Sequence, residues 1–159
     1  MTTPPSTFPV FWQGWKTYQA LLIKAIAPLS ADQLALRAAP NLRPIDNIVS
    51  HIIGARARWY TLDMHEGGEI MASFNDWGRP GTPTRSAAEL VNGLETTWQL
   101  MQAALERWTP AEWEEVVSGT PEEPETRAWV IWHLIEHDLH HGGEVSLTLG
   151  IHGLDAPAL

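Results

Sequence analysis

Proline and glycine divide this chain into four long segments with helical periodicity, and this division constrains the fold most. Proline interrupts a helix because it lacks a backbone N–H, and glycine ends one because it adopts backbone conformations closed to other residues. Between these breaks, hydrophobic residues recur at spacings of three and four, as on one face of a helix. Runs that alternate between apolar and polar residues, which would indicate strands, are missing. We therefore predict an all-α protein, a four-helix bundle with a long crossover loop between its second and third helices.

The first two long helices are predicted from their apolar stripes and flanking residues. The first covers about Phe8–Pro28 and buries a stripe formed by Phe11, Trp15, Tyr18, Leu22 and Ile26. A short helical turn over Ser30–Leu36 follows, with Ser30 as its N-cap. The second long helix covers about Pro44–His65, because proline suits a first turn and Gly67–Gly68 ends the periodicity. The segment Gly67–Arg85 is too long for a tight hairpin, so we expect it to cross the bundle as a candidate lid.

The last two long helices have recognisable caps. Ser86 and Glu89 form a capping-box pattern at the start of the third, which continues to about Trp108. Thr109–Pro110 begins another short helical turn, and a linker follows over Thr120–Glu125. The fourth helix is expected over about Thr126–Leu149, with Gly150 as its stop.

Composition excludes several classes of function. The formal net charge of −9 repels phosphate backbones and anionic lipids, so we expect no nucleic-acid partner and no membrane partner. No stretch approaches the ~18 consecutive apolar residues of a membrane span, and Met1–Val10 lacks the basic start and apolar run of a signal peptide. A length of 159 residues with 44% hydrophobic content fits a single domain over residues 1–159, and we expect a cytoplasmic protein. No cysteine is present, so thiol chemistry would need a thiol from a bound small molecule.

Four histidines crowd the predicted fourth helix, and two of them share one face. His137 and His141 lie about one turn apart at ~100° per residue, so both imidazoles can reach the same ion. Such pairs also occur as surface decoration or as hydrogen-bonded core groups. Here the same face carries four residues that favour an inward orientation, namely Val130, Leu134, Val145 and Thr148. An uncharged imidazole that faces a core needs a partner, and a metal ion is one.

His51 offers a third ligand from the second helix. It lies at the edge of an apolar stripe formed by Ile48, Ile52, Ala55 and Trp59, so it too can face inward. Three neutral nitrogens with open positions are typical of a catalytic metal site, because structural sites normally use four protein ligands. We therefore predict a divalent metal site at His51, His137 and His141, with zinc or nickel preferred and iron(II) acceptable.

Other polar residues near these histidines are weaker candidates. Glu144 lies two turns beyond His137 at nearly the same helical angle, and we predict it as the catalytic residue, although an ordinary polar rim gives the same pattern. Asn47 and Arg58 lie on the His51 side of the second helix and could contact a ligand or substrate. His65 follows His51 by 14 residues, about 21 Å along a helix, which is too far to share an ion. His152 lies past the glycine stop, and we expect it to be exposed. Most of the nine tryptophans are expected to anchor the core or an interface, although Trp59, Trp77 and Trp129 could line a pocket mouth.

These residues together resemble the DinB-like (DinB/YfiT) superfamily of metal-dependent proteins. The segments that carry the resemblance are Asn47-Ile-Val-Ser-His51 and His137-Asp-Leu-His-His141-Gly-Gly-Glu144. The family is a four-helix bundle with one ligand histidine on the second helix and two on the last, in a motif of the form His-x-x-His-His-Arg-Gly-Gln. The resemblance implies that His51, His137 and His141 are the ligands, and that His140 is the neighbouring histidine that is not one.

The chain departs from the family motif after these histidines. It has Gly142, Gly143 and Glu144 where the family usually has Arg-Gly-Gln, so no role of that arginine can be carried over. Relatives include thiol S-transferases that use bacillithiol or mycothiol, a mycothiol-dependent maleylpyruvate isomerase, and many members without a known activity. The resemblance therefore implies a metal site more firmly than a reaction.

Two functions from different classes agree with these observations. In the first, an enzyme uses the metal to activate a low-molecular-weight thiol or water for attack on a small electrophile, as a thiol S-transferase or hydrolase. In the alternative, a non-catalytic, stress-related protein binds a metal or ligand that only pins two helices together. The fourth helix also carries Trp132, Ile135 and Leu139 away from the histidines. We expect a homodimer through that face, unless the chain's own short helical turns bury it.

Overall fold

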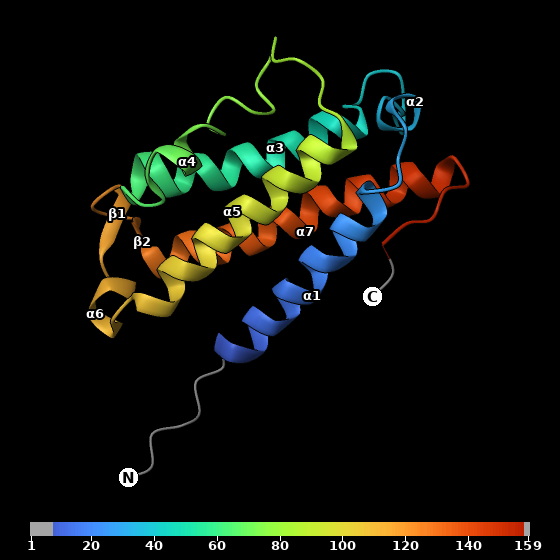
Figure 1. Ribbon diagram of the computed structural model, residues 1–159. Coiled ribbons are helices and arrows are strands. Elements are labelled where there is room, and N and C mark those ends of the chain that lie inside the picture. The colour runs from blue at the N-terminus through green and yellow to red at the C-terminus, as the bar shows by residue number, and fades with distance from the viewer. Residues whose placement is uncertain (1–7, 158–159) are drawn as a thin grey trace.

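The computed structural model describes residues 8–157, and helices make up most of it (Figure 1). In chain order the elements are α1 (Phe8–Ile26), α2 (Ala31–Leu34), α3 (Ile45–Arg58), the π-helix η1 (Trp59–Asp63), α4 (Gly68–Ala72), α5 (Ala87–Arg107), α6 (Pro110–Trp113), β1 (Val116–Gly119), β2 (Pro124–Thr126) and α7 (Arg127–Ile151). The expectation that Met1–Val10 is not a signal peptide falls mostly on residues 1–7, which lie outside the described residues.

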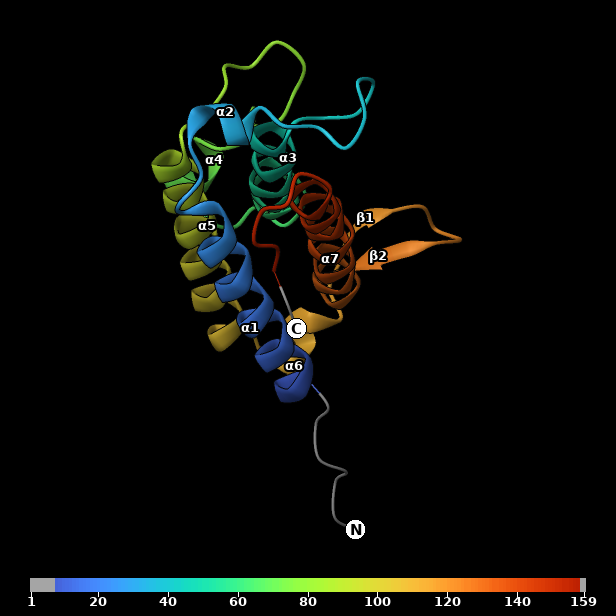
Figure 2. The ribbon, with the colours of Figure 1, turned by 90° about the vertical axis from the view of Figure 1, so that its right-hand side faces the viewer.

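The four long helices α1, α3, α5 and α7 form the predicted bundle. Both α3 and α1 pack against α5 and α7, so each long helix has two long neighbours (Figure 2). Figure 1 shows that α3 and α5 run in one direction along the bundle, while α1 and α7 run in the other. Because two consecutive long helices share a direction, the segment between η1 and α5 must return along the bundle. The predicted crossover is confirmed, and it contains the short helix α4.

Side-chain caps begin the helices where the sequence predicts them. Ser86 accepts a hydrogen bond from the backbone N–H of Glu89 at 3.3 Å, and Glu89 accepts one from the backbone N–H of Ser86 at 2.9 Å. Equivalent capping boxes start α2 at Ser30 and α6 at Thr109. Pro44 is the N-cap of α3. These caps satisfy backbone donors that have no partner inside a helix.

The predicted end of α7 at Gly150 is wrong. The helix continues to Ile151, and Gly153 is the residue that takes the left-handed conformation, at φ 68°. Leu154 N–H bonds to Leu149 C=O at 3.0 Å, and Gly153 N–H bonds to Gly150 C=O at 3.1 Å. This pair of bonds is the Schellman ending of a helix, in which the glycine follows the cap residue. Gly150 and Gly153 are both near the end of the helix, and the hydrogen bonds show that Gly153 is the residue that ends it.

The expectation that the chain has no strands is also wrong. β1 and β2 form a small antiparallel hairpin around the expected linker Thr120–Glu125, with Gly119 opposite Pro124. Gly119 has φ 89°, and Thr120 N–H bonds to Glu123 C=O at 3.0 Å to close the turn. Strands of four and three residues are too short to show an alternating pattern. The hairpin leads directly into α7 (Figure 2).

Two other expectations need correction. The second long helix keeps its α-helical form only to Arg58, and a π-helix carries it on to Asp63, so His65 lies beyond it with φ 54°. Phe11, expected in the core, is 57% exposed and lines an apolar groove beside α6 and α7 instead. Among residues 8–157, no helix combines the length and apolarity needed to cross a membrane.

The core holds a buried ion pair as well as apolar side chains. Arg56 of α3 and Asp138 of α7 are almost fully buried, and Arg56 Nη2 lies 2.5 Å from Asp138 Oδ2. Trp15 Nε1 donates to the same oxygen at 2.7 Å, and Arg56 Nη2 also donates to Gln19 Oε1 at 2.7 Å. Gln19 Nε2 in turn donates to the backbone oxygen of Leu94 at 3.0 Å. This network joins all four long helices beside the segment that carries His137.

Candidate metal centre

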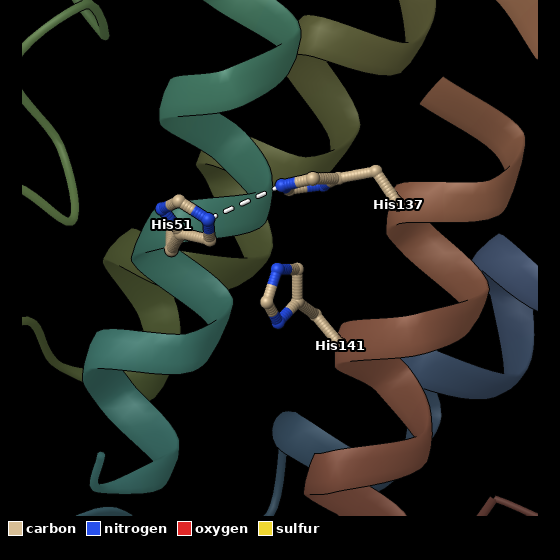
Figure 3. Close-up of side chains that lie close together, drawn as sticks. All are labelled: His51, His137 and His141. Carbon is tan, nitrogen blue, oxygen red and sulfur yellow. Dashed lines mark hydrogen bonds between the residues drawn. The ribbon is translucent and has the colours of Figure 1, made fainter. Parts of the chain in front are cut away.

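His51, His137 and His141 come together between α3 and α7. Figure 3 shows the three imidazoles turned toward one another across the gap between the two helices. His51 Nε2 and His137 Nε2 lie 3.2 Å apart, and one nitrogen from each of the three rings lies within 4.8 Å of the others. All three side chains are half-buried. The structure therefore brings together the three residues that the sequence predicts as ligands.

Helix geometry explains this convergence. His137 and His141 are separated by one turn of α7, and their ring centroids lie 4.4 Å apart. His51 faces them from α3, with centroid distances of 4.9 Å to His137 and 4.7 Å to His141. Close packing of α3 on α7 sets the distance between the two contributions. One helix supplies a pair at fixed spacing, and the other supplies the third ring.

Burial makes the imidazoles of His51 and His137 weak bases. Desolvation, together with the neighbouring cations Arg43 and Arg58 and the His141 ring, lowers the pKa of His51 to about 4. Desolvation and the rings of His141 and His51 lower the pKa of His137 to about 3. Both side chains are therefore neutral near pH 7, and a neutral imidazole has a lone pair free for a metal ion.

The donor set fits a divalent metal ion. Neutral imidazole nitrogen binds zinc, nickel and iron(II) well. Nδ1 of His137 is buried and has no hydrogen-bond partner among the described residues, so Nε2 is the nitrogen of this ring that faces a partner. Three imidazoles this close together cannot all serve as hydrogen-bond partners for one another. One cation between them can instead bind a ring nitrogen of each.

Glu144 lies beside the cluster and contacts one of its members. Glu144 Oε2 is 2.7 Å from His141 Nδ1, which leaves His141 Nε2 turned toward His51 and His137 (Figure 3). The carboxylate therefore contacts the outer nitrogen of a candidate ligand. Its side chain is 44% exposed, and its other oxygen lies 4.0 Å from His140 Nε2.

The remaining histidines lie outside the three-histidine cluster. His65 is exposed in the turn after η1 and does not belong to the cluster, as its spacing from His51 predicts. His133 stacks on Trp129 at 5.1 Å between ring centroids, and its centroid lies 6.1 Å from that of His137. His140 belongs to a second, more exposed group with His141 and Glu144. His152, predicted to be exposed, is so, and its Nε2 lies 2.9 Å from the carbonyl oxygen of Arg37.

The other predicted polar contacts have different surroundings. Asn47 lines a polar cavity of about 330 Å³ together with Arg43 and Asp46. Arg58 points to the crossover segment, where its Nη1 donates to the backbone oxygens of Asn75 at 2.7 Å and Trp77 at 3.4 Å. Neither residue belongs to the metal cluster.

Sequence reasoning missed two features next to the histidines. The first is the buried pair Arg56–Asp138, whose charged residues interrupt apolar stripes beside the ligand positions. A charge inside an apolar stripe is a visible signal for such a pair. The second is Gly78, whose backbone lies against the turn of α3 that carries His51. No local pattern announces that contact, because it joins segments 27 residues apart.

Comparison with known proteins identifies the family of the chain. A family model described as the DinB superfamily matches residues 15–145, a range that contains all three clustered histidines. The chain belongs to the DinB superfamily. The resemblance found in the sequence motifs is thereby confirmed. No curated protein shows significant similarity to the chain.

Two solved structures share the DinB fold. A DinB-like protein from Bacillus cereus superposes with a TM-score of 0.72 at 22% sequence identity, covering 94% of this chain and 95% of that one. A conserved protein from Enterococcus faecalis superposes with a TM-score of 0.69 at 11% identity, covering 92% and 99%. At these identities the likeness establishes the architecture of a DinB bundle.

Proposed function

We propose that this DinB-superfamily chain binds one divalent metal ion with His51, His137 and His141, and that it is a metal-dependent transferase or hydrolase acting on a small electrophile. The convergence of the three half-buried imidazoles from two helices carries this proposal. Zinc or nickel suits the ligands best, and iron(II) is acceptable. A divalent cation held there would act as a Lewis acid that lowers the pKa of a thiol or of water.

The protein's own residues have distinct parts in the proposed site. The three imidazoles bind, and their neutral state near pH 7 means that no proton has to leave His51 or His137 first. Glu144 accepts a hydrogen bond from His141 Nδ1, which fixes the tautomer and presents Nε2 to the ion. Because Glu144 is also partly exposed, we propose that it exchanges a proton with the substrate or solvent.

Two observations favour catalysis over a purely structural ion. Three protein ligands leave coordination positions open, whereas a structural site normally closes with four. The three side chains are half-buried, so a small molecule could reach the site from solvent. The absence of cysteine makes a low-molecular-weight thiol the natural nucleophile, with water as the alternative.

Metal binding tests the first half of the proposal. We expect chelator-treated protein to take up one Zn²⁺ or Ni²⁺ per chain, and the His51→Ala variant to lose most of that affinity. His140→Ala is the matched control, because this neighbouring histidine is 68% exposed and outside the three-histidine cluster. Glu144→Gln should weaken binding by about tenfold, as for other residues that orient a ligand histidine. Equal affinities in the wild type and His51→Ala would contradict the site.

Activity tests the second half. Metal-loaded protein is assayed with common thiols and electrophiles, and separately with activated esters for hydrolysis. The proposal expects turnover that chelation and His51→Ala both remove. A protein that binds one metal ion tightly but shows no turnover above the His51→Ala variant with any pair would instead be a non-catalytic metal-binding protein.

A further inference from the structure

The backbone of the crossover segment lies directly against the turn of α3 that carries His51. A Cβ atom added at Gly78 would lie 2.5 Å from the backbone nitrogen of His51 and 2.9 Å from its Cβ. Both distances are shorter than atoms tolerate, so no side chain fits between the two segments. Gly78 also has φ 71°, a conformation that glycine adopts without strain. The absence of a side chain at Gly78 is what allows this close approach.

A second glycine makes the same approach possible from the helix side. Gly54 follows His51 by three residues on α3. A Cβ atom added at Gly54 would overlap the carbonyl oxygen of Trp77 and lie 2.8 Å from Arg58 Nη1. Helix α3 therefore lacks a side chain where the crossover backbone passes. Two glycines, one on each segment, face the same contact beside the candidate ligand.

Polar bonds hold the crossover segment in this place. Arg58 Nη1 donates to the carbonyl oxygens of Asn75 at 2.7 Å and Trp77 at 3.4 Å. Thr61 Oγ1 lies 3.0 Å from Asn75 Oδ1 and 2.9 Å from the carbonyl oxygen of Ala57, and its one hydroxyl proton is shared between these two acceptors. Both donors come from the helical segment that continues from His51. The contacts join the crossover to the ligand-bearing helix rather than to a separate part of the fold.

Aromatic packing completes the attachment. Phe74 is buried, and its ring meets that of Trp77 edge-on, with 5.0 Å between centroids. The guanidinium of Arg85 lies over the Trp77 ring at 4.4 Å from its centroid. The Trp77 ring also reaches α5, where a Cβ atom at Gly93 would lie 3.2 Å from it. These contacts attach the part of the crossover around Phe74–Gly78 to both α3 and α5.

We propose that Phe74–Gly78, here called the strap, is a positioning element that holds His51 at the distance the metal site needs. The proposal rests on the proposed metal function and deepens it. The strap backbone presses on the His51 turn at Gly78, while Arg58 and Trp77 fix the strap to α3 and α5. His51 is the only one of the three candidate ligands on α3, so its placement sets whether the third nitrogen meets the pair on α7.

The test compares two glycines with the same backbone requirement. Gly78→Ala puts a methyl group into the strap contact. Gly81→Ala is the matched control, because Gly81 lies in the same crossover at φ 82° with nothing within 4 Å of an added Cβ. Both variants carry similar backbone strain, so only the contact with His51 differs. The affinity for Zn²⁺ is measured by competition with a chromophoric chelator, and the metal-free His51 imidazole is followed by ¹H–¹⁵N NMR.

If the strap positions His51, Gly78→Ala weakens Zn²⁺ binding by about tenfold or more and shifts the His51 imidazole signals. Gly81→Ala then behaves like the wild type. Equal affinities and equal His51 signals in the two variants would overturn it. If the wild type binds no metal, the proposed function fails, and the His51 signals alone decide on the strap.

A further variant covers the case in which Gly78→Ala does not fold. Arg58→Lys keeps the positive charge near His51 but replaces the planar group that reaches two carbonyls. Its control is Arg79→Lys at an exposed position of the same crossover. The proposal expects weaker Zn²⁺ binding and displaced His51 signals for Arg58→Lys only. Identical behaviour of the two lysine variants would overturn it.

Discussion

His51 and His137 are neutral in the folded protein because burial removes the solvation that an imidazolium needs. Their pKa values of about 4 and about 3 lie below the ordinary value of 6.5 that each ring has in the unfolded chain. Between these values, the unfolded chain binds protons that the folded chain does not. Stability must then fall as the pH decreases from about 6.5 toward 4 and 3, since protons favour the state that binds them.

The first prediction at this scale is therefore a loss of stability of the metal-free protein in mild acid. The urea midpoint at pH 5 should be lower than at pH 7, because both rings must stay neutral in the folded state. His137→Gln keeps a polar side chain but cannot be protonated, so its midpoint should change less over the same interval. A pH dependence identical in the wild type and His137→Gln would show that burial does not hold this imidazole neutral.

Single residues also show how far the candidate site could be predicted. The spacing of His137 and His141 fixes their shared face, and the apolar stripe around His51 fixes its inward side, so all three were found from the sequence. The contact of Glu144 with His141 Nδ1 depends on side-chain rotamers, and no sequence pattern shows them. Gly78 could not be interpreted at all, since its importance depends on a neighbour that only the fold supplies.

At the scale of elements, the buried network holds the four long helices in one arrangement. Asp138 of α7 accepts hydrogen bonds from Arg56 of α3 and Trp15 of α1, and Arg56 Nη1 reaches Thr97 of α5 at 3.4 Å. A buried charge needs its partner, because removal of one member leaves the other desolvated and unpaired. If α3 slid along α7, the network would break, and His51 would move away from His137 at the same time.

Asp138→Asn should destabilise the protein by about 3–5 kcal/mol, because it leaves the Arg56 guanidinium buried without a counter-charge. Chemical denaturation with a chelator present measures this loss without a contribution from bound metal. Asp155→Asn, at an exposed position near the end of α7, is the control and should change stability by less than about 0.5 kcal/mol. Similar unfolding midpoints for the two asparagine variants would mean that the pair contributes little to the bundle.

Elements with a local signal were predicted well, and those defined by pairing were not. Ser86 and Glu89 cap α5 through bonds between near neighbours, so the sequence shows where the helix begins. The end of α7 depends on bonds across the last turn, which Gly150 and Gly153 could both offer. The β1–β2 hairpin has strands too short for periodicity, and its identity comes only from the pairing of one strand with the other.

At the scale of the whole molecule, two properties act in opposite directions on association. The net charge of −9 makes copies of the chain repel one another. Trp132 and Leu139 on the outer face of α7 remain exposed, at 57% and 45%. An apolar groove of about 470 Å³ continues this face, with Phe11, Trp113 and Ile135 among its lining residues. The short helix α6 therefore covers only part of the stripe that the sequence predicts as an interface.

We propose that two copies of the chain associate through this face. Light scattering at high protein concentration should give a mass near twice the 17.7 kDa of one chain. Higher salt should favour the dimer, because it screens the repulsion between two acidic chains. Trp132→Glu should give a monomer, since it places another negative charge in the contact, whereas Ile70→Glu, at an exposed position on α4, should leave the dimer intact. A mass of one chain at every concentration and salt level would rule out this dimer and leave the groove open to a different occupant.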